Sequence, residues 1–238
     1  MQDHSSIAPF DVVPDPRVRA VLARLHHEAE RQERFLRLRF LSEAPRFLLG
    51  RSLRWDRVGR RLDDAFIALD RSQGAFCYLL ARALGARRIV EFGTSFGVST
   101  IWLAAAVREN GGGRVIGTEL VPSKAARARE HLKEAGLDDL VEIREGDAVE
   151  SLAGIEGPVD MMLNDGFPPK ALDVLRVVEP ALREGAVVVA DNVGAFPADH
   201  ADYLEWLRDP RNGWVSTRVD LNEGTELSVR VVTPRLAA

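Results

Sequence analysis

The feature that most constrains this fold is a β-prone run that enters a turn with two spaced glycines. It spans residues 88–100, RIVEFGTSFGVST, and an amphipathic stretch, residues 101–108, follows without a gap. This order is typical of a strand, a tight turn and a helix. Glycine allows the backbone to leave a strand at angles that cost other residues more, so such turns commonly seat a nucleotide-like cofactor.

The spacing within the turn narrows the choice of ligand. Gly93 and Gly97 are separated by three residues, which differs from the Gly-x-Gly-x-x-Gly spacing of dinucleotide-binding proteins. Glu91, at the end of the strand, would repel a pyrophosphate and suits a cationic or hydroxyl-rich ligand. We expect Ser99 and Thr100 to cap the exposed amides of the new helix.

After this turn, β-rich and helical patterns alternate along the chain. Alternation of this kind predicts an α/β fold with a parallel sheet covered on both faces. The last two β-rich runs flank an Asn-Glu-Gly turn and predict an antiparallel hairpin. The predicted strands are 114–120, 140–145, 159–164, 186–190, 215–221 and 226–232, and the predicted helices are 123–135, 149–152, 170–182 and 199–207.

Residues 1–70 have a different pattern, without β-rich runs. They predict an N-terminal arm over residues 1–14 and a helical cap, with one long amphipathic helix from Pro16 that breaks before Pro45 and a second over 55–69. A third helix, 72–84, opens the second unit. We therefore divide the chain into an arm and cap, 1–70, and one cofactor-binding domain, 71–238.

An acidic residue follows nearly every predicted strand. Ligands of parallel α/β sheets bind beyond the carboxyl ends of the strands, where these acids gather. Glu119, after the second strand, can accept both hydroxyls of a ribose. Asp147 or the Ala148 amide can reach an adenine base, although a helix cap at Asp147 is an equal alternative.

Two neighbouring strand ends combine into a candidate metal site. Asp165 follows one apolar strand, and Asp191 with Asn192 follows the next. If these strands are neighbours, two carboxylates and one amide oxygen converge and form an all-oxygen set suited to Mg²⁺. The absence of Cys or His nearby argues against zinc. The alternative is that these residues only close turns after the strands.

The stretch EFGTSFGVS resembles the first motif of class I S-adenosylmethionine-dependent methyltransferases, in the form found in the catechol and caffeoyl-CoA O-methyltransferase group. The resemblance covers roughly residues 70–238 and includes the three predicted metal ligands. It implies a Rossmann-like, mostly parallel sheet with a C-terminal antiparallel hairpin, a homodimer, and Mg²⁺ or another divalent cation such as Ca²⁺ or Mn²⁺. The cofactor contacts implied are Glu91, Gly93, Thr94, Ser95, Gly97, Ser99, Glu119, Asp147, Ala148 and Asp165.

One departure from that family concerns the general base. The family commonly has a lysine three residues after the first metal aspartate, where this chain has Pro168. Lys170 is a substitute if the prolines redirect the chain, but it is equally a surface lysine at a helix start. Asp165 and His200 are the other candidates. A bound cation lessens the demand on any base, because it lowers the pKa of a coordinated hydroxyl.

Four aromatic side chains are candidates for the wall of an acceptor site: Trp55, Phe66, Phe167 and Phe196. Packing in the core is the more common fate of such residues. Phe167 and Phe196 follow the two predicted metal strands closely, and we favour Phe167 alone.

Bulk properties exclude several classes of protein. With 46% hydrophobic and 29% charged residues, the composition is that of a globular protein, and no apolar run reaches the roughly 20 residues of a membrane span. Residues 1–10 lack the pattern of a secretion signal, and the single cysteine, Cys77, cannot form an intrachain disulfide. We therefore expect a cytoplasmic protein with no membrane partner.

The net charge of −4 gives no general reason to expect nucleic acid, but it is unevenly distributed. Residues 31–61 contain ten arginines and three acids. This segment is a solvated helical face, a subunit contact, or a clamp for an anionic acceptor such as a CoA ester.

The sequence thus predicts transfer of a methyl group from S-adenosylmethionine to a hydroxyl of a small catechol-like or vicinal-diol acceptor chelated by Mg²⁺. The alternative within the same class is a metal-independent O- or N-methyltransferase acting on another small biosynthetic intermediate. A nucleic-acid-binding module or RNA methyltransferase is disfavoured, because the remainder of the chain is acidic.

Overall fold

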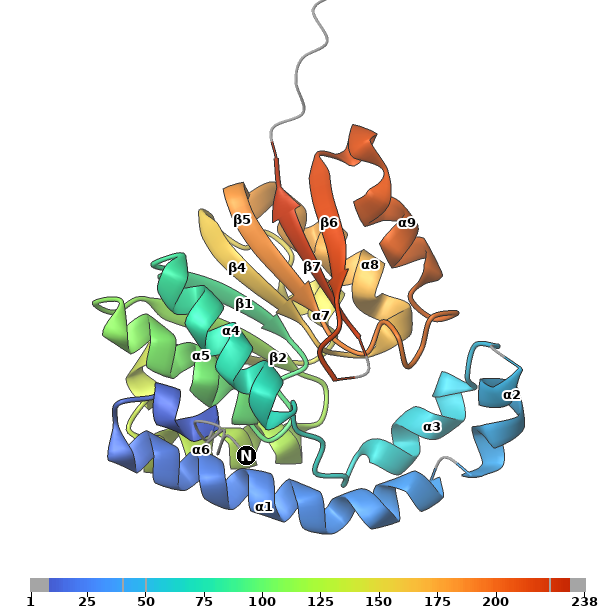
Figure 1. Cartoon of the computed structure of the whole chain (residues 1–238). Coiled ribbons are helices and arrows are strands. Elements are labelled where there is room, and N and C mark those ends of the chain that lie inside the picture. Colours follow the sequence, from blue (N-terminus) through green and yellow to red (C-terminus); the bar gives the residue numbers. More distant parts are fainter. Residues whose placement is uncertain (1–8, 40, 50, 223, 232–238) are drawn as a thin grey trace, which may run out of the picture.

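The computed structural model describes residues 9–39, 41–49, 51–222 and 224–231. Within them the chain forms a seven-stranded sheet in the order β3-β2-β1-β4-β5-β7-β6 (Figure 1). The first five of these strands run parallel, and β7 is antiparallel to both β5 and β6. The strands are β1 (Arg88–Phe92), β2 (Arg114–Glu119), β3 (Val141–Glu145), β4 (Val159–Asn164), β5 (Leu182–Ala190), β6 (Trp214–Val219) and β7 (Thr225–Arg230).

The predicted α/β class and terminal hairpin are confirmed, and the hairpin folds back so that its second strand pairs with β5. The central strands are buried on both faces, which is why their sequences are continuously apolar. Met161 and Leu163 of β4 enter one hydrophobic core and Met162 enters the other. This alternation follows from the two-residue period of a strand.

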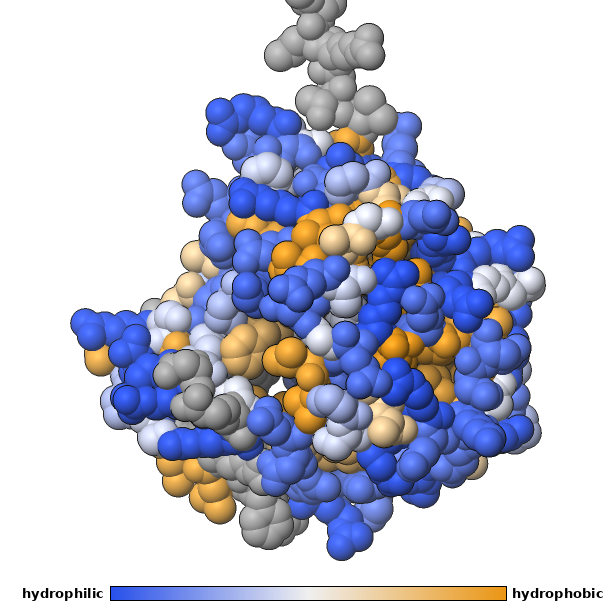
Figure 2. Space-filling view, turned by 180° about the vertical axis from the view of Figure 1, so that it is seen from behind, coloured by the Kyte–Doolittle hydropathy of each residue, from blue (hydrophilic) through white to orange (hydrophobic). Residues whose placement is uncertain are grey.

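Helices cover both faces of the sheet (Figure 1). The core on one face contains residues of α4 (Arg71–Ala83), α5 (Val98–Glu109) and α6 (Pro122–Ala135), and α1 (Pro16–Arg39) packs outside α5 and α6. The other face is covered by α7 (Ala148–Ser151), α8 (Ala171–Val178) and α9 (Ala201–Arg208). Seen from behind, the surface is mostly hydrophilic, with smaller apolar areas between polar side chains (Figure 2).

The cap agrees with its prediction in one detail and differs in another. Helix α1 ends at Arg39, before Pro45 as predicted, and a short turn, η2 (Leu41–Glu43), separates it from α2 (Ala44–Leu48). Helix α3 (Trp55–Leu62) ends seven residues earlier than predicted, and an irregular segment leads to Asp70, which caps α4 by accepting from the Ser72 amide at 2.8 Å. Helix α3 lies on the side of the sheet toward which β1, β4 and β5 point (Figure 1).

Other predicted boundaries also shift. In place of the predicted helix 170–182, the short α8 lies between two 3₁₀ turns, η4 (Pro168–Lys170) and η5 (Glu179–Ala181). Strand β5 already begins at Leu182. Of the predicted arm, residues 9–12 form the turn η1 (Pro9–Val12), whose Phe10 ring stacks on Trp102 with centroids 5.8 Å apart, and residues 1–8 lie outside the described residues. None of the described helices is long and apolar enough to cross a membrane.

Candidate active site

The carboxyl ends of β1, β4 and β5 lie side by side at one edge of the sheet. β4 pairs with β1 on one side and with β5 on the other, so the assumption that β4 and β5 are neighbours holds. Backbone hydrogen bonds continue just past the strands, from the Asp165 amide to the Phe92 carbonyl at 3.0 Å and from the Asp191 amide to the Asn164 carbonyl at 3.2 Å. The acids after these strands are therefore held together by the register of the sheet.

The turn after β1 depends on its glycines. Gly93 has φ of 98°, Ser95 of 48° and Gly97 of 83°, so the turn repeatedly enters a region that side chains disfavour. A Cβ atom on Gly93 would lie 2.5 Å from the Asp165 carbonyl oxygen, and one on Gly97 would lie 3.1 Å from the Ala128 Cβ. Gly93 thus lets the turn lie directly against the segment after β4, and Gly97 lets it lie against α6.

Glu91 lies beneath this turn, completely buried. Its Oε2 accepts hydrogen bonds from the hydroxyls of Thr94 at 2.8 Å and Thr100 at 2.5 Å. Its Oε1 is also buried and has no hydrogen-bond partner among the described residues. Burial raises the pKa of Glu91, while the hydroxyls of Thr100, Ser99 and Thr94 act in the opposite direction. A carboxylate oxygen buried without a donor costs free energy, and a ligand donor that reached it would remove that cost.

The predicted capping role of Ser99 and Thr100 is wrong. Helix α5 begins after Gly97 without a side-chain cap, and the Thr100 hydroxyl turns inward to Glu91. The physical reason is that a buried carboxylate is costly without donors, and the Thr100 hydroxyl supplies one.

Glu119 joins the turn to the end of β2. Its Oε2 accepts from the Ser95 amide at 2.7 Å and its Oε1 accepts from the Val121 amide at 2.8 Å. A carboxylate accepts about four hydrogen bonds, so both oxygens keep capacity for hydroxyl donors. Contact of Glu119 with a ribose remains a prediction.

Asp147 caps α7, since its Oδ1 accepts from the Val149 amide at 2.8 Å. This is the helix-cap alternative raised by the sequence. Ala148 is buried in the core on the same face as α7 and α8. Contact of these two residues with adenine remains a prediction.

The three predicted metal ligands do come together. The Asn192 amide nitrogen lies 3.5 Å from Asp165 Oδ1, and Asn192 has φ of 60°, a strained value for a residue with a side chain. Desolvation, and then the charges of Asp191 and Glu91, raise the pKa of Asp165 well above its usual range. A divalent cation would relieve that repulsion.

The donor chemistry at this edge fits a hard cation. Two carboxylates and one amide are oxygen donors, which hard cations prefer. The described residues include no group of three or more His, Cys, Asp or Glu side chains that could hold a metal, so the proposed set depends on the amide oxygen of Asn192 as its third ligand. The amide nitrogen of Asn192, and not its oxygen, faces Asp165, so the amide must turn over to serve as a ligand.

A fourth polar residue at this edge, Gln73, was missed by the sequence analysis. It lies in the first turn of α4 and is 2% exposed. Its amide nitrogen donates to Asp191 Oδ1 and, at 2.9 Å, to the Thr225 hydroxyl oxygen, while its oxygen accepts from the Asn222 amide at 3.1 Å. One signal was available: Gln73 shares a helix face with the apolar Cys77.

Two of the three candidate bases, Lys170 and His200, lie away from Asp165. Lys170 is exposed, and its ammonium group pairs with Asp173 at 3.7 Å on the first turn of α8. His200 is buried, with its Nδ1 3.0 Å from the Phe196 carbonyl oxygen, and burial lowers its pKa. The described contacts join neither side chain to Asp165.

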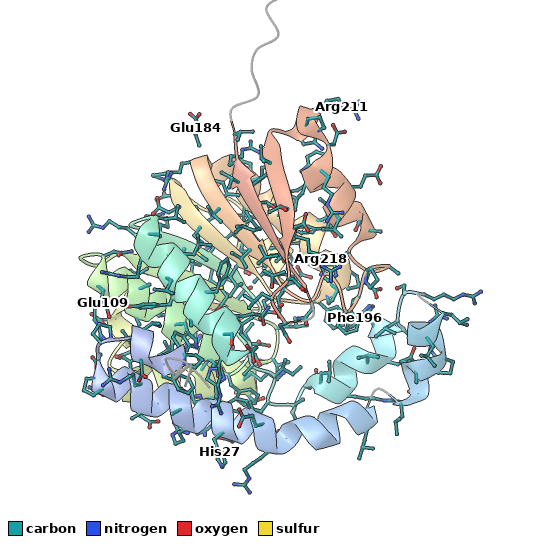
Figure 3. All side chains as sticks on the ribbon, in the orientation of Figure 1. His27, Glu109, Glu184, Phe196, Arg211 and Arg218 are labelled. Carbon is teal, nitrogen blue, oxygen red and sulfur yellow. The ribbon has the colours of Figure 1, made fainter. Side chains whose placement is uncertain are left out.

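Three of the four predicted aromatic residues meet above this edge. The Trp55 ring of α3 packs edge-on against Phe167, with centroids 4.9 Å apart, and against Phe196, at 5.1 Å. Phe196 lies in the loop that faces α3 (Figure 3). Phe66 instead stacks on Phe96 at 4.5 Å. The cap is thus held over the segments that follow Asp165 and Asn192.

Three arginines of the arginine-rich segment make contacts within the cap. Arg54 forms an ion pair with the buried Glu43 at 2.6 Å, and Arg61 donates to the Ser42 hydroxyl at 2.8 Å. Arg46 donates to the Ser52 carbonyl at 2.7 Å. Part of this segment therefore stabilises the α2–α3 turn, and the predicted clamp for an anionic acceptor stays a prediction.

Comparison with known proteins adds independent evidence. The profile of a family described as "Methyltransferase domain" matches residues 90–193. Two curated proteins named catechol O-methyltransferase are similar: one from Niastella koreensis is 38% identical over 131 residues, and one from Mycobacterium tuberculosis is 40% identical over 128. These matches cover 53% of this chain and 58% and 57% of the two relatives, so the chain spans a little over half their length.

A solved structure is similar over more of the chain. It is that of the O-methyltransferase TomG from Streptomyces achromogenes, involved in tomaymycin synthesis, in complex with SAM. The two chains are 29% identical with a TM-score of 0.62, and the match covers 73% of this chain and 86% of that one.

Proposed function

We propose that this chain, whose sequence and fold are those of the S-adenosylmethionine-dependent class I O-methyltransferases, methylates a hydroxyl of a small acceptor that is held by a divalent cation. The observation that carries the proposal is the meeting of Asp165, Asp191 and Asn192 at the ends of β4 and β5, beside the glycine turn. The printed names of the two curated relatives favour a catechol as acceptor.

Binding of the cofactor is supported by the turn after β1. The tight approach of Gly93 to Asp165 leaves backbone where a side chain would otherwise stand. The unpaired Glu91 Oε1 and the remaining acceptor capacity of Glu119 suit the ammonium group and hydroxyls of S-adenosylmethionine. When bound, this cofactor supplies a methyl group on a positively charged sulfur, which a hydroxyl oxygen can attack.

The candidate metal ligands are Asp165, Asp191 and Asn192, with Mg²⁺ as the preferred ion and Ca²⁺ or Mn²⁺ as substitutes. A cation bound there would lower the pKa of an acceptor hydroxyl and fix its direction of approach. A metal-activated hydroxyl needs a general base less, which is consistent with Lys170 being paired with Asp173 on the surface and away from Asp165. The protein's own contribution is then to position the acceptor and to exclude water.

Exclusion of water is assigned to the cap. Trp55, packed against Phe167 and Phe196, covers the two segments that carry the acidic residues. If the cap opens to admit a flat aromatic acceptor, the acceptor ring can contact the same aromatic side chains, so less apolar contact is lost.

The test is calorimetric titration of Mg²⁺ into protein preloaded with S-adenosylhomocysteine, repeated with Asp191→Ala. The matched control is Asp173→Ala, which removes an exposed carboxylate from α8. We expect saturable binding in the wild type and the control, and none in Asp191→Ala.

A second assay addresses the acceptor. Methyl transfer to 3,4-dihydroxybenzoate should exceed transfer to 4-hydroxybenzoate, because only the first can chelate a cation through adjacent oxygens. Binding of the cofactor product without any Mg²⁺ binding, together with equal rates on both acceptors, would favour the metal-independent alternative.

A further inference from the structure

We propose that Gln73 is a positioning residue that orients the Asp191 carboxylate for a divalent cation. This inference rests on the proposed function, because it assigns a role at the same metal site. It concerns a residue of α4, outside the strand ends that supply the candidate ligands themselves.

Gln73 connects three elements that are distant in the sequence. Its side chain leaves the first turn of α4, contacts Asp191 at the end of β5, and contacts Thr225 and Asn222 of the β6–β7 hairpin. Gln73 and Thr225 are 2% and 1% exposed, so water cannot replace these contacts. The hairpin thus contacts both the nitrogen and the oxygen of the glutamine amide.

The direction of the hydrogen bonds fixes which end of the amide faces Asp191. The Thr225 hydroxyl donates its one proton to the Leu221 carbonyl at 3.3 Å, so its oxygen must accept from Gln73. The Asn222 amide nitrogen donates to the Gln73 oxygen. A reversed amide would place its oxygen against the Asp191 carboxylate, where two acceptors repel.

A neutral donor is the right partner for a carboxylate that must bind a cation. An arginine or lysine at this position would neutralise Asp191 and compete with the metal. An amide N–H holds one oxygen in place and leaves the negative charge intact. Because a carboxylate accepts about four hydrogen bonds, the Gln73 contact leaves lone pairs for coordination.

The experiment compares Mg²⁺ binding by the wild type and Gln73→Met, both preloaded with S-adenosylhomocysteine. Methionine has a similar length and no donor, so Asp191 loses its orientation while the core stays filled. We expect the Mg²⁺ dissociation constant to rise about 10- to 100-fold, the usual range for residues that orient metal ligands. The affinity for S-adenosylhomocysteine should not change.

Two further variants separate positioning from packing. Tyr78→Phe removes a hydrogen bond from the same helix to Glu109, away from the metal site, and should leave Mg²⁺ affinity unchanged. Thr225→Val keeps Gln73 but removes the hydroxyl that orients its amide, and should weaken Mg²⁺ binding by a smaller factor. If Gln73→Met does not fold, Thr225→Val decides the question.

The possible results separate the two proposals. If the wild type binds no Mg²⁺, the proposed metal site is wrong and this inference falls with it. If the wild type binds Mg²⁺ and both Gln73→Met and Thr225→Val bind it equally well, the metal site stands and the positioning role is wrong. A loss of S-adenosylhomocysteine affinity as large as that for Mg²⁺ would also overturn it, because the residue would then be supporting the whole edge.

Discussion

Replacing Gly93 with alanine should destabilise the protein by forcing the turn after β1 away from the segment after β4. The added Cβ would lie 2.5 Å from the Asp165 carbonyl oxygen and 2.8 Å from the Gly166 Cα. Both neighbours are backbone atoms, so no side-chain rotation relieves the overlap. Relief requires the turn after β1 to move away from the segment after β4.

The expected cost has two parts. At φ of 98° a residue with a side chain loses about 1–2 kcal/mol, of which about 0.4–1 is returned because alanine restricts the unfolded chain. Overlap with immobile neighbours adds about 1–3 kcal/mol. The free energy of unfolding should therefore fall by about 2–4 kcal/mol, a large share of the roughly 5–15 kcal/mol typical of a folded protein.

Gly111→Ala is the matched control. Gly111 has φ of 90°, and nothing lies within 4 Å of an added Cβ, so only the backbone cost of about 1 kcal/mol applies. Urea denaturation measures both variants, and titration with S-adenosylhomocysteine follows the site. The dissociation constant for S-adenosylhomocysteine should rise about tenfold or more in Gly93→Ala, because a loss of about 1.4 kcal/mol of binding free energy corresponds to a tenfold change. It should stay unchanged in Gly111→Ala. Equal losses of stability in the two variants would refute the reasoning.

Two further predictions use matched pairs of buried and exposed groups. Burial, with a smaller contribution from a nearby arginine, lowers the pKa of His26 to about 4, so the unfolded chain takes up this proton first as the pH falls. The free energy of unfolding should therefore drop by up to about 3 kcal/mol as the pH falls from 6.5 to 4, and this loss should be absent above pH 6.5. Denaturation at a series of pH values measures it. The control variant His27→Gln removes the exposed neighbouring histidine and should show the same drop (Figure 3). Arg208→Met removes both hydrogen bonds of the guanidinium to the fully buried Glu226, and should lower the free energy of unfolding by about 2 kcal/mol in urea denaturation. Arg211→Met changes a side chain that is 87% exposed and should lower it hardly at all. Equal losses in the two variants would contradict this prediction.

The strand, turn and helix around Gly93 could be predicted because each depends on residues adjacent in the sequence. The same holds for the Asp147 cap, whose acceptor lies two residues from its donor. The meeting of Asp165 with Asn192 required one more assumption, that successive strands are neighbours. That assumption holds for β4 and β5.

Predictions failed where a partner is remote in the sequence. Thr100 has the pattern of a helix cap, yet its hydroxyl serves Glu91 of the preceding strand. Gln73 reads as an ordinary residue near a helix start, because its partners lie at Asp191 and in the hairpin. The end of α3 at Leu62 was likewise not predicted, because no glycine or proline in the sequence marks it.

By itself the sequence determined the alternation of strands and helices, the glycine turn and the row of acids at one edge, because period, backbone freedom and residue chemistry are local properties. Only the tertiary structure decided what those acids face. Among the described residues, one buried oxygen of Glu91 has no hydrogen-bond partner, and the hairpin holds Gln73 against Asp191. Trp55 of the cap meets two phenylalanines from separate loops. These relations depend on distances across the fold, which chain order does not contain.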